Sequence, residues 1–167
     1  MARGTYVLVL YLAEATEITV GRLGRFTFTA GYYAYVGSAL GGLEVRVNRH
    51  LRAGKCLHWH IDYLTAVAPV VGVYVQEGAG RRECLVAQTL SSQPGARLPV
   101  RGFGSSDCRC PAHLVWFGGE PAVGSGLPAF RRWQGPVPHR ALPVASRLAG
   151  GTRPAIRMGD DLSGRGP

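Results

Sequence analysis

The chain has 167 residues, 46% of them hydrophobic, which is enough for one domain with a true core and excludes a wholly disordered protein. The formal net charge is +9, and Lys55 is the only lysine among 19 basic residues. Arginine contacts phosphates bidentately, so this balance favours a polyanionic partner, although a genome-wide arginine bias explains the excess equally well. The apolar run at 6–13 is too short to span a bilayer and lacks a cleavage site, so we expect a cytoplasmic protein without membrane contact. Its four cysteines are then expected to be thiols or metal ligands rather than disulfides.

Strand and helix patterns alternate through the first 118 residues. A continuous apolar run predicts a buried strand at 5–12, and alternating segments at 18–20 and 26–28 flank a glycine-bearing turn and predict a hairpin. The further predicted elements are a strand at 32–36, helices at 43–51 and 58–66, a strand at 70–76, a helix at 82–90, and short strands at 100–103 and 114–117. This order predicts a small α/β or α+β domain.

The composition changes at residue 119. Residues 119–167 contain most of the 11 prolines, many glycines and no apolar periodicity. We therefore divide the chain into a domain at 1–118 and a disordered tail at 119–167. The tail is net basic and could contact nucleic acid non-specifically, but a solvated tail without function is the simpler interpretation.

Three short motifs carry a resemblance to a known family. Tyr35-Val36-Gly37 ends a predicted strand, and Arg46 and His50 follow four residues apart on the next helix. Gly4-Thr5-Tyr6 lies on the opening strand, and Glu83 follows two arginines at the start of a later helix. Together these residues resemble the signature of the GIY-YIG nuclease superfamily. The resemblance implies a GIY-YIG-like α+β domain with a central, mostly antiparallel sheet flanked by helices.

Two longer blocks make the resemblance closest to an uncharacterised prokaryotic branch of that superfamily. They read LHWHIDYL at 57–64 and GFGSSDCRCPAHL at 102–114. One departure is that Tyr6 and Tyr35 are 29 residues apart rather than about ten, so the predicted hairpin is inserted between the motif strands. The local mimic Gly31-Tyr32-Tyr33 lies too close to Tyr35 to form a separate strand, and we treat it as a decoy.

The resemblance also implies a reaction and a role for each residue. Tyr6 would orient or deprotonate the attacking water, Tyr35 would add a second phenol, and His50 would relay a proton or touch phosphate. Arg46 would clamp the phosphate, and Glu83 would bind one Mg²⁺ or Mn²⁺ ion. The implied activity is metal-dependent endonucleolytic cleavage of nucleic acid, with DNA expected and a partner protein supplying recognition. The alternative is a non-catalytic nucleic-acid-binding module on the same fold.

The cysteine-rich loop allows two interpretations. Cys108, Cys110 and His113, with His60 or His58 as the fourth ligand, could bind zinc. Because Cys-x-Cys-x-x-His is not a common finger spacing, we favour a polar loop folded over the cleft, in which Asp62 and loop residues make hydrogen bonds. Cys84, on the helix after Glu83, is expected to be a core thiol.

Overall fold

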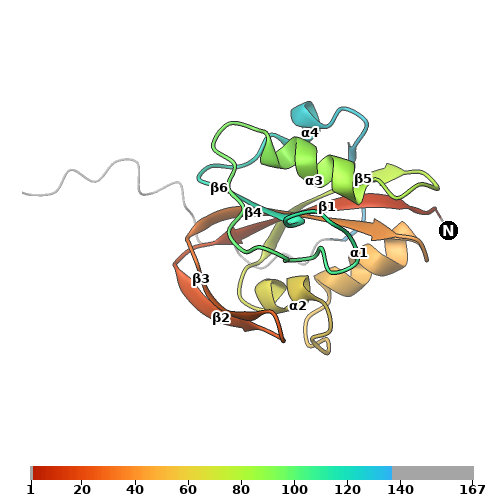
Figure 1. Cartoon of the computed structure of the whole chain (residues 1–167). Helices are drawn as coiled ribbons and strands as arrows, with labels where there is room; N and C mark the ends of the chain where they lie inside the picture. The colour runs from red at the N-terminus through yellow and green to blue at the C-terminus, as the bar shows by residue number, and fades with distance from the viewer. Residues whose placement is uncertain (1, 137–167) are drawn as a thin grey trace, which may run out of the picture.

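A computed structural model of the chain describes residues 2–136 (Figure 1). Five antiparallel strands form a central sheet in the order β6-β4-β1-β5-β7, and β2 and β3 form a separate hairpin. The elements are β1 Gly4–Leu12, β2 Thr16–Val20, β3 Gly24–Phe28, β4 Gly31–Ala39, α1 Leu43–Leu51, α2 His60–Thr65, β5 Val70–Glu77, α3 Glu83–Ser91, β6 Leu114–Phe117, α4 Val123–Gly126 and β7 Arg131–Arg132. The α+β class with an antiparallel sheet is therefore confirmed. None of these helices has the length and hydropathy needed to cross a membrane.

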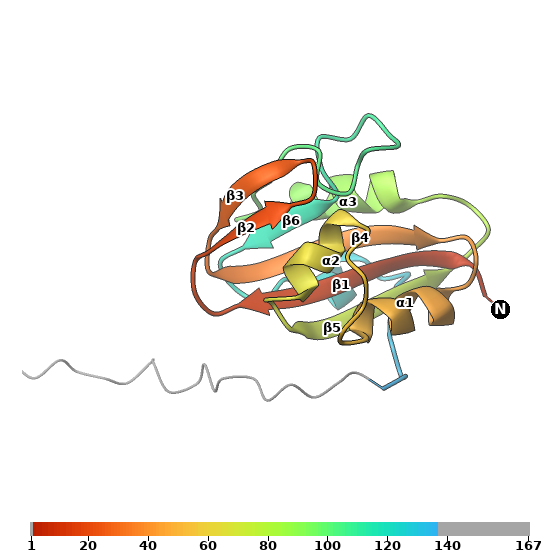
Figure 2. The same cartoon turned by 90° about the horizontal axis from the view of Figure 1, so that it is seen from below.

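The sheet separates two apolar cores. Helices α1 and α2 and the β2–β3 hairpin cover one face, and α3 and α4 cover the other (Figures 1 and 2). Along β1, Leu8 and Leu10 face the first core, whereas Val7 and Val9 face the second. Because β1 is central and covered on both faces, its sequence is continuously apolar rather than alternating.

The pairing of β1 with β4 places both motif tyrosines on one face. Tyr6 lies opposite Gly37 and Leu8 opposite Tyr35, and the two tyrosine rings are 6.3 Å apart. A Cβ atom at Gly37 would lie 2.3 Å from the Tyr6 Oη, so only glycine leaves room for this phenol. The hairpin between the two strands packs with α2 and leaves their register continuous, as predicted for an insertion.

Two sequence predictions were wrong: the strand at 100–103 and the end of the domain at residue 118. Residues 100–103 form a turn rather than a strand, because Gly102 has a φ of 84° and its chain reverses there. The domain also continues past residue 118. Its last described segment contains α4 and β7, and Val123, Leu127 and Phe130 are buried in the second core. These apolar residues are too few to give a periodicity against the surrounding glycine and proline; the rest of the predicted tail, 137–167, lies outside the described residues.

We expect a chain ending at residue 118 to be less stable than one ending at 136 by several kcal/mol. It loses three buried apolar side chains, each contributing about 2 kcal/mol, and the β7 pairing with β5. Urea denaturation of both truncated chains measures the difference. Equal unfolding midpoints would show that 119–136 adds nothing to the core.

Candidate functional site

A polar cleft of about 500 Å³ lies beside the motif tyrosines, where β4 extends beyond its pairing with β6. Its walls come from β1, β4, α1, α3 and two loops, 57–60 and 104–113. The side chains of Tyr6, Tyr35, Arg46 and Glu83 all line it. The cleft therefore gathers residues that are far apart in the sequence.

The Tyr6 phenol is hydrogen-bonded to the His50 ring. Tyr6 Oη lies 2.8 Å from His50 Nε2, and both side chains are buried. Burial lowers the pKa of His50 to about 3; the Asp62 carboxylate acts in the opposite direction, and the cations of Lys55, Arg46 and Arg49 add to the lowering. The ring is therefore neutral, and in the tautomer whose proton is on Nδ1, 3.9 Å from the Asp62 carboxylate, Nε2 accepts the hydrogen bond from Tyr6.

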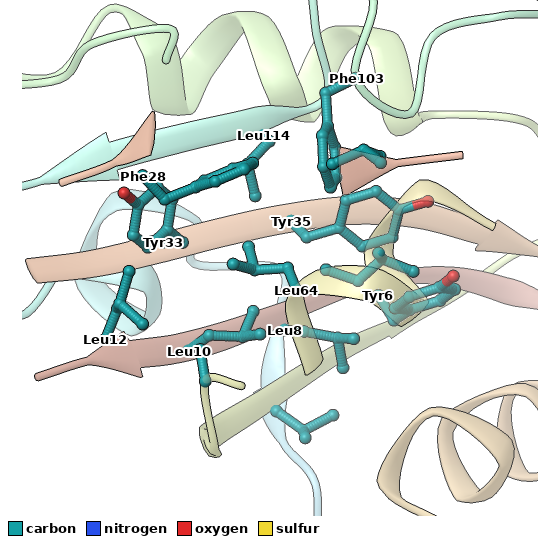
Figure 3. Close-up of a cluster of buried hydrophobic side chains, with 14 of the residues drawn as sticks. Tyr6, Leu8, Leu10, Leu12, Phe28, Tyr33, Tyr35, Leu64, Phe103 and Leu114 are labelled. Carbon is teal, nitrogen blue, oxygen red and sulfur yellow. The ribbon is translucent and has the colours of Figure 1, made fainter. Parts of the chain in front are cut away.

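Both cleft tyrosines hold their protons. Burial raises the pKa of Tyr6 well above its usual value, Tyr35 adds to the rise, and Arg46 opposes it. Burial also raises the pKa of Tyr35 to about 12. At neutral pH the cleft presents two neutral phenols, whose oxygens can still accept hydrogen bonds. The hydroxyls of Tyr6 and Tyr35 point to the same end of the sheet, as Figure 3 shows.

Tyr33 points the other way in Figure 3, and its hydroxyl donates to the Thr29 carbonyl at 2.5 Å. Its ring packs edge-on against Phe28, far from the cleft lining. This placement fits the interpretation of Gly31-Tyr32-Tyr33 as a decoy.

The Asp62 carboxylate lies next to His50 and holds the segment before α2. This buried carboxylate accepts two hydrogen bonds of 3.0 Å from Arg49 and two of 2.9 Å from the backbone N–H groups of His58 and Trp59. Although burial alone would raise its pKa, these bonds lower the pKa of Asp62. The carboxylate reaches back to the start of α2 as a helix cap does, and its Oδ1 lies 3.9 Å from His50 Nδ1.

The ring of Trp59 contacts two arginines of α1. The guanidinium of Arg49 lies 3.9 Å from its ring centre and that of Arg46 lies 4.3 Å away. Arg49 is paired with Asp62, whereas Arg46 has no carboxylate within ion-pair distance among residues 2–136. Arg46 is therefore held in the cleft wall with its charge available to a ligand. No sequence pattern indicated the role of Trp59 or Arg49.

Glu83 stands on the opposite wall, at the first residue of α3. It is buried, and it accepts a hydrogen bond from the Ser38 hydroxyl, the residue after Gly37 on β4. Arg81 instead pairs with Asp107 on the exposed rim at 3.3 Å. Glu83 is thus the buried carboxylate of the cleft.

Next to Glu83, three cysteines and one histidine converge. The ligand atoms of Cys84, Cys108, Cys110 and His113 all lie within 4.8 Å of one another, so the group can hold a metal ion. His60 is absent from this group, because its Nδ1 accepts the Gly104 N–H at 3.0 Å instead.

The structure thus changes two expectations about the loop. Cys84 joins the cluster rather than packing as an isolated core thiol, and it replaces His60 as the fourth ligand. Cys84 lies on a separate helix, far along the chain from Cys108, so no short spacing motif could include it. The same loop also lines the cleft through Gly104, Ser106 and Asp107, so the lining and the cluster coexist. All four cysteines are free thiols.

Fold and site together define a small α+β domain with a phenol-, arginine- and carboxylate-lined cleft beside a Cys3His cluster. The chain belongs to the DUF123 family, described as a domain of unknown function, whose family model matches residues 5–127. No curated protein and no solved structure matches the chain. The family match, like the fold, extends past residue 118.

The buried histidines predict that acid destabilises the fold. Because the pKa of His50 is lower in the folded chain than the usual value of about 6.5, only the unfolded chain takes up a proton between about pH 3 and 6.5. Stability therefore rises with pH across this window and is lost as pH falls; His60 and His113, whose pKa values burial also lowers, add to it.

We expect His50→Gln to reduce the proton uptake on unfolding at pH 5 by up to about one proton. Urea unfolding at several pH values measures the slope. His58→Gln, at an exposed position, is the matched control. Identical slopes in His50→Gln and the wild type would exclude a buried neutral His50.

Proposed function

We propose that this protein is a divalent-metal-dependent phosphodiesterase that cleaves nucleic acid, with a GIY-YIG-type active site in the polar cleft. One observation carries the proposal: the Tyr6 phenol, hydrogen-bonded to neutral His50, shares a cleft with the free charge of Arg46 and the buried carboxylate of Glu83. These are the groups that phosphodiester hydrolysis needs for water activation, charge neutralisation and metal binding.

Glu83 fits a single Mg²⁺ or Mn²⁺ ion. These ions prefer oxygen ligands and keep several waters, so one or two carboxylates suffice. The carboxylate of Glu83 makes no ion pair among residues 2–136, and the Ser38 hydroxyl fixes its orientation. When bound there, the ion would neutralise charge on the phosphate and lower the pKa of a coordinated water.

In this proposal Tyr6 acts as a relay rather than as a phenolate. The attacking water gives a proton to the Tyr6 oxygen while the phenolic proton passes to His50 Nε2. The resulting imidazolium faces Asp62, whose Oδ1 is 3.9 Å from Nδ1. Arg46 binds the scissile phosphate, and Tyr35 borders the same space and can hydrogen-bond a phosphate oxygen.

The substrate we propose is DNA, bound through its phosphates. The chain is net basic, and Arg46 offers a backbone contact that carries no base information. We therefore propose that a partner protein supplies recognition. A reducing cytoplasm suits the four free thiols and is the proposed location.

A second function, binding nucleic acid without cleavage, is favoured by one observation. The pKa of Tyr6 is raised well above its usual value and that of His50 is lowered to about 3, so proton transfer between them is costly in the free protein. A bound cation and phosphate would have to offset this cost for catalysis.

Tyr6→Phe separates the two functions. It removes one oxygen and keeps the ring, so substrate affinity should change little. If the phenol relays a proton, the cleavage step should fall by roughly 10²–10⁴-fold. Single-turnover cleavage of duplex and branched DNA with Mn²⁺ measures this. Tyr33→Phe, whose hydroxyl faces away from the cleft, is the control and should cleave at the wild-type rate. Loss of activity in the control alone would refute the motif assignment.

Arg46→Ala should behave differently, because it removes the phosphate contact itself. We expect both slower cleavage and weaker binding, with the slope of log affinity against log salt reduced by about one. Fluorescence anisotropy over a salt series measures binding. Unchanged affinity and slope would place the phosphate elsewhere.

Glu83→Gln should abolish Mn²⁺-dependent cleavage while DNA affinity measured with EDTA stays the same. Its control is Glu44→Gln, which removes the same charge at an exposed position on α1. Retained cleavage in Glu83→Gln would remove this carboxylate from the site.

A further inference from the structure

The Cys3His cluster joins three separate segments. Cys84 lies in the first turn of α3, Cys108 and Cys110 lie in the loop before β6, and His113 immediately precedes β6. His113 is buried, and its backbone is fixed by bonds from its own N–H to the Phe103 carbonyl at 2.8 Å and from the Val36 N–H at 3.0 Å. The cysteines thus converge on a histidine held by the sheet.

Two sulfur–nitrogen distances in the cluster match the edges of a tetrahedral zinc site. With Zn–S bonds of about 2.3 Å and Zn–N bonds of about 2.0–2.1 Å, the S···N edge of a tetrahedron is about 3.5 Å. The Sγ atoms of Cys108 and Cys84 lie 3.4 Å and 3.7 Å from His113 Nε2.

Hydrogen bonds satisfy these thiols only one at a time: Cys108 Sγ can donate to the Ser105 carbonyl at 3.7 Å, which leaves His113 Nε2 to Cys84. The Nε2 atom of a neutral imidazole offers either one lone pair or one proton, so it can satisfy only one thiol at a time. Two sulfur atoms nevertheless lie close to the same nitrogen, and the Cys110 sulfur lies within 4.8 Å of it. A cation at the centre would satisfy all four ligands together.

Regular secondary structure does not hold this loop in place. Residues 104–113 contain no helix or strand, and its backbone bonds include Gly102 N–H to Pro111 O at 2.7 Å and Cys108 N–H to Ser105 O at 3.3 Å. A metal held by thiolates can supply the folding free energy that such a segment lacks.

We propose that Cys84, Cys108, Cys110 and His113 bind one structural zinc ion that fastens loop 104–113 to the start of α3. Thiolate-rich ligand sets select zinc over Mg²⁺ and Mn²⁺, and four protein ligands leave no open position for substrate. Because Glu83 precedes Cys84 and Asp107 precedes Cys108, the zinc fixes one wall of the cleft. The zinc proposal rests on the geometry of these four residues and does not require the cleft to have nuclease activity.

The test uses the full chain purified under reducing conditions without a metal-affinity tag and incubated with zinc. After dialysis, elemental analysis should give about one zinc per chain. Cobalt(II) exchanged into the wild-type protein should give the intense visible bands of tetrahedral thiolate coordination. Cys84→Ser should lower zinc retention at least tenfold, whereas Cys56→Ser, exposed and outside the cluster, should retain it.

Thiol accessibility gives a second measurement, independent of any variant's folding. In the zinc-loaded wild type, only Cys56 should react rapidly with a thiol reagent, and all four cysteines should react after a strong chelator is added. Zinc below about 0.1 per chain with free thiols, octahedral cobalt spectra, or equal zinc loss in Cys56→Ser would each overturn the proposal. None of these measurements involves nucleic acid, so they stand or fall separately from the cleavage assays.

Discussion

The antiparallel pairing of β1 with β4 is the constraint on which the site depends. It sets Tyr6 opposite Gly37 and so leaves space for the phenol where a side chain would collide. The same register brings Ser38 to Glu83 and keeps Tyr35 on the face of Tyr6. A slip of β4 by one residue against β1 would turn Tyr35 to the other core, where α3 packs, and separate the two phenols. The apolar burial on both faces fixes the register, because each core accepts only its own set of side chains.

Asp62 is the second organising group, and its effect is electrostatic. A carboxylate with no exposed surface needs compensation, and here Arg49 and two backbone N–H groups provide it. The pairing holds Arg49 at Asp62, while the Trp59 ring contacts the guanidinium groups of both Arg49 and Arg46. Consequently α1 carries two arginines with different roles: one neutralises a buried charge, and the other presents its charge to the cleft.

Neighbouring residues at the start of α3 carry two kinds of metal-ligand atom, the carboxylate oxygens of Glu83 and the sulfur of Cys84. Successive side chains on a helix point about 100° apart, so Glu83 faces the cleft and Ser38 while Cys84 faces the loop and His113. Oxygen and sulfur ligands are thereby kept in separate groups. In the two proposals above, this separation would let a hard cation at Glu83 and a soft one at the Cys3His cluster occupy adjacent sites without competing for ligands.

Features that depend on local pattern could be predicted from the sequence. The apolar run of β1, the hairpin inserted before β4, and the helical spacing of Arg46 and His50 were all predicted, because each follows from backbone periodicity within a few residues. Tertiary structure alone decided which distant groups meet. It paired Asp62 with Arg49, gave Cys84 rather than His60 to the cysteine cluster, and packed Val123 and Phe130 into the second core. No local periodicity encodes these contacts, since each joins elements whose separation along the chain bears no relation to their distance across the sheet.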